Sequence, residues 1–172
     1  MTISSLPNIL TLSRIPIAML AYLAFKQWDM RVGLILFIIG FISDWIDGNL
    51  ARKYNCQTDF GKLLDPVTDK FLVLIGFLIL SEKHIIPYWI VILIAIREIY
   101  FTAFRIIRIK KGFPVIPAGW WGKVKTTVQM FTLGIGLSSL AFNLNALYLP
   151  CLAFAYLSLI LTYYSGLKIW QN

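Results

Sequence analysis

The sequence predicts an all-α, polytopic membrane protein with six transmembrane helices, and its composition and apolar segments are the evidence. Hydrophobic residues make up 59% of the 172 residues and charged residues 14%, whereas soluble domains are about half apolar and about a quarter charged. The mean hydropathy is +0.75. A soluble core of this size could not bury so much apolar surface. We expect a single integral-membrane domain over residues 1–172, because no internal repeat or low-complexity segment divides the chain.

Six apolar segments follow one another along the chain, at about residues 9–25, 32–51, 61–81, 85–107, 126–142 and 147–167. A helix needs about 20 residues to cross a bilayer. The last two segments approach this length without a charged residue. The second, third and fourth reach it only if their charged residues are helical too, and those charges must then face a hydrated, protein-lined cavity.

The distribution of basic residues predicts the orientation in the membrane. If the N-terminus is cytoplasmic, only Lys26, Arg31 and Lys83 of the 16 basic residues lie on the opposite side. Cytoplasmic loops of membrane proteins carry such an excess of Lys and Arg. We therefore expect a multi-pass protein of the bacterial inner membrane whose active site faces the cytoplasm. The net charge of +8 then indicates contact with anionic membrane lipids, and no nucleic-acid partner is expected.

Four carboxylates stand at helical spacing between the second and third apolar segments. Asp44 and Asp47 are three residues apart, and Asp65 and Asp69 are four apart, so each pair projects from one face of its helix. A short loop over residues 53–60 would bring the two pairs together. Carboxylates at membrane depth are costly to desolvate, and a functional role is the default interpretation.

Such a cluster favours a site for hard divalent cations. Four adjacent carboxylates cannot all remain ionised without cations, and Mg²⁺ binds through oxygen ligands and leaves positions for substrate phosphates. Gly48 would let a ligand approach the backbone, and Arg52 offers a fork for phosphate. The alternative is that the acids pair with neighbouring basic side chains at the helix ends. We expect Asp59 in the connecting loop, as a solvated acid.

These residues resemble the signature of the CDP-alcohol phosphatidyltransferase family. The motif is Asp44-x₂-Asp47-Gly48-x₂-Ala51-Arg52-x₈-Gly61-x₃-Asp65-x₃-Asp69, and it matches without departure. The resemblance implies that family's six-helix fold, two Mg²⁺ or Mn²⁺ ions per site, and transfer of a phosphatidyl group from CDP-diacylglycerol to an alcohol with release of CMP. It also implies a homodimer.

The resemblance assigns a role to each residue of the motif. Asp44 and Asp65 would bridge both metal ions, Asp47 would complete one metal site, and Asp69 would bind the second ion and act as general base on the acceptor hydroxyl. The donor CDP-diacylglycerol would be bound by six residues outside this group of acids. They are Asn8, Thr11, Gly48, Arg52, Thr58 and Gly61.

Other basic residues indicate the acceptor. Segments around Leu6–Arg14, Arg97–Glu98 and Gly122–Gln129 look like those of bacterial family members that use sn-glycerol 3-phosphate. Arg97 follows an apolar run, where a lone cation needs an anionic partner, and Glu98 either pairs with it or faces another helix. The predicted acceptor-phosphate ligands are Arg97, Arg105, Lys123 and Lys125.

Two alternatives to this function stay open. A family member that uses phosphatidylglycerol, and so makes cardiolipin, would need a roomier acceptor site with fewer cations; other alcohol acceptors are further options within the family. A cation transporter could also carry intramembrane carboxylates. It would, however, spread them along a permeation path with some repeat symmetry, whereas these acids gather at one face of the membrane.

Overall fold

The computed structural model describes residues 6–54, 59–111 and 119–170, and within these residues it is all-helical, with no strand. The six predicted helices are all present, so the all-α prediction is confirmed. Their bounds are α1 Leu6–Gln27, α2 Met30–Tyr54, α3 Asp59–Glu82, α4 Tyr88–Lys110, α5 Trp120–Ala141 and α6 Tyr148–Trp170, with a short 3₁₀ turn η2 at Asn145–Leu147. The chain groups into two compact units, Met1–Gly76 and Phe77–Asn172.

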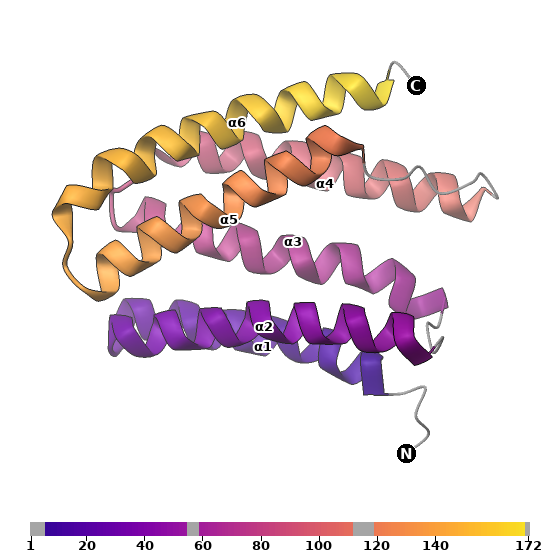
Figure 1. Ribbon diagram of the computed structural model, residues 1–172, viewed down its shortest axis with the longest axis horizontal. Helices are drawn as coiled ribbons and strands as arrows, with labels where there is room; N and C mark the ends of the chain where they lie inside the picture. Colours follow the sequence, from indigo (N-terminus) through magenta and orange to yellow (C-terminus); the bar gives the residue numbers. More distant parts are fainter. Residues whose placement is uncertain (1–5, 55–58, 112–118, 171–172) are drawn as a thin grey trace. The chain divides into compact units, whose positions relative to one another are not determined.

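In the first unit, α1 and α2 form an antiparallel pair joined by a two-residue turn (Figure 1). Asp29 caps the start of α2: its Oδ1 accepts a hydrogen bond of 2.7 Å from the backbone N–H of Arg31. Its carbonyl accepts a bond of 3.0 Å from the N–H of Gly33. A cap of this kind satisfies amides that have no partner within the helix, and so it sets where α2 begins.

Small side chains let α1 and α2 approach each other closely. Ala18, Ala21 and Ala24 lie on one face of α1 and are completely buried. On α2, a Cβ built at Gly33 would lie 2.6 Å from the ring of Phe25. Only glycine fits at this contact without displacing the ring, and small residues at such contacts are typical of helix pairs in membranes.

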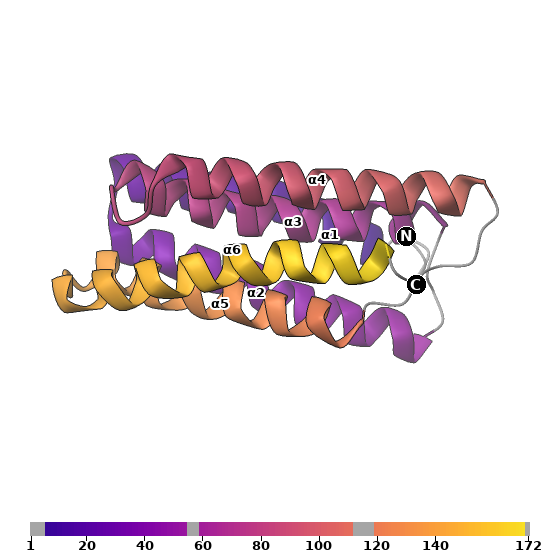
Figure 2. The same cartoon turned by 90° about the horizontal axis from the view of Figure 1, so that it is seen from above.

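In the second unit, two helices end in the same kind of backbone turn. His84 after α3 and Asn143 after α5 both have positive φ, 59° and 54°. At the second turn the N–H of Leu144 donates a bond of 2.9 Å to the carbonyl of Ser139. This bond between residues five apart is the Schellman arrangement that closes a helix, and it lets α6 return antiparallel beside α5 (Figure 2).

The core of the second unit lies around Gly136 of α5. A Cβ at this position would lie 2.6 Å from Cδ2 of Leu80 and 2.7 Å from Sγ of Cys151. The α5 backbone is therefore held against the end of α3 and the start of α6. The largest completely or almost completely buried apolar side chains of this unit are Phe77, Ile79, Leu80, Ile90, Ile94, Leu133 and Leu137.

Much of the described surface is apolar. On α2 the exposed side chains include Ile35 and Ile42, and on α4 they include Ile92, Ile96 and Ile99. Among the residues that the structure describes, one helical segment, Asn145–Lys168, is long and apolar enough to cross a membrane, and a shorter apolar segment lies at Met30–Ser43.

Candidate functional site

The acidic motif spans the facing ends of two consecutive helices of the first unit. Asp44 and Asp47 lie in the last three turns of α2, and Asp65 and Asp69 lie in the first three turns of α3. Their side chains are outside the described part of the structure, so the metal site stays a prediction. Asp59 is predicted in the connecting loop, and this is wrong: α3 already begins at Asp59, a difference of a residue or two that is common at helix ends.

The remaining predicted donor residues have no described side-chain contacts. The backbone places Asn8 and Thr11 in α1, Gly48 and Arg52 in α2, and Gly61 in α3. Thr58 lies outside the described residues. Arg105 belongs to α4, and its side chain is likewise outside the described part.

A buried polar cluster lies in the second unit, where three helices meet. Glu98 of α4 is at its centre: Oε1 accepts a hydrogen bond of 3.3 Å from Nη1 of Arg97 and another from Nζ of Lys125 in α5. The side chains are 3%, 7% and 5% exposed. Glu98 is predicted either to pair with Arg97 or to face another helix, and it does both.

Arg97 is held on three sides. Its Nη2 donates a bond of 2.8 Å to Oγ of Ser165 in α6, and its guanidinium carbon lies 4.4 Å from the ring centroid of Phe101. Gly166 leaves room for this stack, because a Cβ there would lie 3.0 Å from the Phe101 ring and 3.5 Å from Nε of Arg97. The guanidinium therefore has a defined plane, which suits an arginine that binds a planar or tetrahedral oxyanion.

A second row of polar side chains continues the cluster between α5 and α6. Gln129, one turn beyond Lys125, donates a bond of 3.3 Å from Nε2 to Oγ1 of Thr162. The hydroxyl of Ser165 donates 3.0 Å to the carbonyl of Thr162. Sequence reasoning missed the parts played by Thr162 and Ser165. The signal was there: they stand three residues apart in an otherwise apolar helix, where polar side chains usually face other helices.

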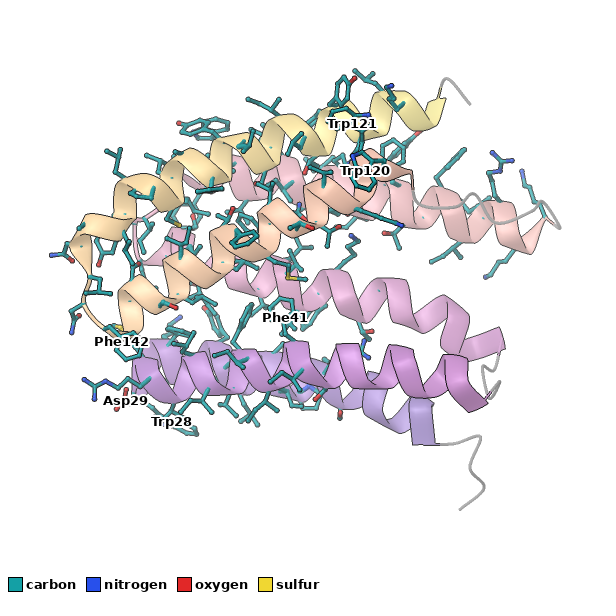
Figure 3. The ribbon with its side chains drawn as sticks, viewed as in Figure 1. Trp28, Asp29, Phe41, Trp120, Trp121 and Phe142 are labelled. Carbon is teal, nitrogen blue, oxygen red and sulfur yellow. The ribbon has the colours of Figure 1, made fainter. Side chains whose placement is uncertain are left out.

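The structure thus brings together only some of the predicted acceptor ligands. Arg97 and Lys125 share one carboxylate oxygen, whereas Lys123, two residues before Lys125 on α5, is exposed. Residues two apart on a helix do not face each other. Figure 3 shows Trp120 and Trp121 at the start of α5, where the Trp121 ring lies 4.8 Å from that of Tyr164.

The cluster contains the kinds of side chain that bind anions. Arg97 and Lys125 are almost fully buried, and both bond to Oε1 of Glu98. The arginine fork and the ammonium are the groups that bind phosphate oxygens most strongly in proteins.

Comparisons with known proteins identify a family. A family model described as CDP-alcohol phosphatidyltransferase matches residues 4–164. The chain is 39% identical over 156 residues, 81% of its length, to the CDP-diacylglycerol–glycerol-3-phosphate 3-phosphatidyltransferase of Bacillus subtilis, of which it covers 80%. Proteins with the same name from Haemophilus influenzae and Rickettsia felis are also similar. The Haemophilus influenzae protein is 38% identical over 175 residues, which cover 97% of this chain and 92% of that protein. The Rickettsia felis protein is 37% identical over 136 residues, which cover 76% of this chain and 74% of that protein. These matches confirm the resemblance that the acidic motif indicates.

Proposed function

The chain belongs to the CDP-alcohol phosphatidyltransferase family, and we propose that it transfers the phosphatidyl group of CDP-diacylglycerol to sn-glycerol 3-phosphate. The products are phosphatidylglycerophosphate and CMP, a step in the synthesis of the anionic lipids phosphatidylglycerol and cardiolipin. Support for this acceptor comes from the names of the similar proteins, which specify glycerol 3-phosphate.

The buried cations of α4 and α5 are the observation that carries the acceptor assignment. Arg97 and Lys125 converge on one oxygen of Glu98. One phosphate oxygen of glycerol 3-phosphate can accept hydrogen bonds from an arginine and a lysine in the same way. An acceptor without a phosphate offers these two cations no such oxygen.

The donor set on α2 and α3 fits the divalent cations that the family implies. Asp44, Asp47, Asp65 and Asp69 supply carboxylate oxygens, the ligands that Mg²⁺ and Mn²⁺ prefer, and the backbone places them at the joined ends of two consecutive helices. When bound, two such ions neutralise the charge of the pyrophosphate and of the departing CMP. Arg52 and Gly48 in the same turns of α2 bind the cytidine diphosphate portion of the donor.

Asp69 takes the proton from the acceptor. The hydroxyl of glycerol 3-phosphate attacks the phosphorus that carries the diacylglycerol, and a base hydrogen-bonded to this hydroxyl contributes a rate factor of about 10²–10⁴. Arg97 and Lys125 bind the acceptor through its phosphate. An acceptor whose orientation is fixed before the reaction reacts faster than a free one.

The proposal includes a membrane location. Exposed isoleucines along α2 and α4 suit contact with lipid, and the aromatic residues at the start of α5 suit the headgroup level. All six helices have 22–25 residues, enough to cross a bilayer. The excess of basic residues in the expected cytoplasmic loops supports an active site on the cytoplasmic side of the bacterial inner membrane. A homodimer follows from the family resemblance alone.

Release of CMP by the purified protein tests the function. The protein is supplied with CDP-diacylglycerol, Mg²⁺ and one acceptor at a time: glycerol 3-phosphate, glycerol, phosphatidylglycerol, serine or inositol phosphate. We expect CMP with glycerol 3-phosphate alone. Glycerol is the matched control, because it has the same hydroxyl groups and no phosphate. Release with phosphatidylglycerol instead would make the protein a cardiolipin synthase and overturn the proposal.

A further inference from the structure

The geometry around Glu98 is more specific than charge neutralisation requires. The same oxygen, Oε1, accepts from Nη1 of Arg97 and from Nζ of Lys125, although these two cations belong to different helices. Two positively charged donors are therefore held within reach of a single oxygen. That is the arrangement needed to bind one oxygen of a phosphate.

The two cations that bond to Glu98 are held in different ways. Arg97 is held by Ser165 and by the Phe101 ring in addition to Glu98. Lys125 has a flexible stem of four carbons and a compact head without a fixed plane, and its ammonium is aligned with Arg97 through the shared carboxylate. The shared carboxylate is thus the described contact that relates the position of one cationic group to that of the other.

We propose that Glu98 is a positioning residue of the acceptor site, whose carboxylate aligns Arg97 and Lys125 for the phosphate of the acceptor alcohol. This inference rests on the function proposed above. Glu98 touches neither the reacting phosphorus nor the hydroxyl; it acts through the two cations. Its loss should therefore weaken acceptor binding and leave the donor and the chemical step nearly unchanged.

Steady-state kinetics of Glu98→Gln tests this role. The amide keeps the size of the side chain and removes the negative charge. We expect KM for glycerol 3-phosphate to rise by about tenfold to about a hundredfold, the loss typical of one charge-assisted hydrogen bond. KM for CDP-diacylglycerol and kcat should stay within about threefold, within ordinary mutational variation. Ile94→Val, one turn earlier on α4 and completely buried, is the matched control and should change neither KM.

A double-mutant cycle separates positioning from a general loss of packing. If Glu98 acts through Lys125, then Glu98→Gln should add little to the effect of Lys125→Met on KM for glycerol 3-phosphate, because the two residues form one unit. Additive effects would refute the inference. A KM that falls in Glu98→Gln would also refute it, since the carboxylate would then be competing with the acceptor for the cations.

Two further outcomes keep the inference distinct from the proposed function. If Glu98→Gln does not fold, Glu98→Asp keeps the charge and withdraws the oxygen from both cations, and the same rise in KM is expected. If the unmodified protein releases no CMP with glycerol 3-phosphate, the proposed function itself fails. If the unmodified protein does release CMP with glycerol 3-phosphate, and the Glu98 variants leave KM unchanged as Ile94→Val does, the function stands and the positioning role is wrong.

Discussion

Replacing Gly136 by alanine tests how tightly α5 packs in the second unit. The added Cβ would lie 2.6 Å from Leu80 and 2.7 Å from Cys151, well inside the 3.4 Å at which ordinary van der Waals contact begins. Both neighbours are completely buried, so neither can move into open space. Overpacking of a core in this way costs about 1–3 kcal/mol. We therefore expect Gly136→Ala to unfold at a lower temperature than the unmodified protein.

Thermal unfolding of the purified protein in detergent measures this effect. For a chain of this length a loss of 1 kcal/mol lowers Tm by about 2–4 °C. Gly134→Ala is the matched control, because a Cβ there meets nothing within 4 Å. Alanine is the better helix former by about 0.5–1 kcal/mol, so this control should be as stable as the unmodified protein or slightly more stable. Equal Tm values for the two variants would refute the close packing of Gly136.

Three further predictions concern the reaction. Asp69→Asn should lower kcat by at least about a hundredfold through loss of the base while CDP-diacylglycerol still binds; normal turnover in a CMP-release assay would exclude Asp69 as the base. EDTA should stop CMP release and added Mg²⁺ or Mn²⁺ should restore it, because four clustered carboxylates imply divalent cations; activity that persists in EDTA would contradict the metal site. Arg97→Ala should raise KM for glycerol 3-phosphate by about tenfold or more, with a much smaller effect on KM for CDP-diacylglycerol; equal effects on both substrates would argue against an acceptor ligand.

The positions of the helices could be predicted well from the sequence, since long apolar segments separated by charged loops leave few alternatives. The fifth helix shows the limit. The apolar segment predicted there begins at about residue 126, whereas α5 begins at Trp120. Lys123 and Lys125 lower the hydropathy of this stretch, yet Lys125 is buried because Glu98 pairs with it. A helix partner that comes from another part of the chain does not appear in a local hydropathy pattern.

The candidate site was predictable to a different extent in its two parts. The motif from Asp44 to Asp69 indicates the family from the sequence alone, because its residues and gaps match the family signature. Helical periodicity adds that each pair of acids lies on one face of its helix. The contact of Glu98 with both cations depends on which face α5 turns towards α4. Close packing such as that of Gly136 against Leu80 of α3 and Cys151 of α6 helps to fix how α5 lies, and a single sequence carries no direct record of such packing.

The adjacency of Arg97 and Glu98 has a consequence for how the protein is made. They lie next to each other near the middle of α4, whereas Lys125 and Ser165 belong to helices that the ribosome adds later. Because synthesis begins at the N-terminus, α4 is made before those partners exist. Because the two opposite charges are neighbours, this helix is electrically neutral at its centre from the start. In the membrane location proposed above, the newly made segment would therefore carry no isolated charge before α5 and α6 are made.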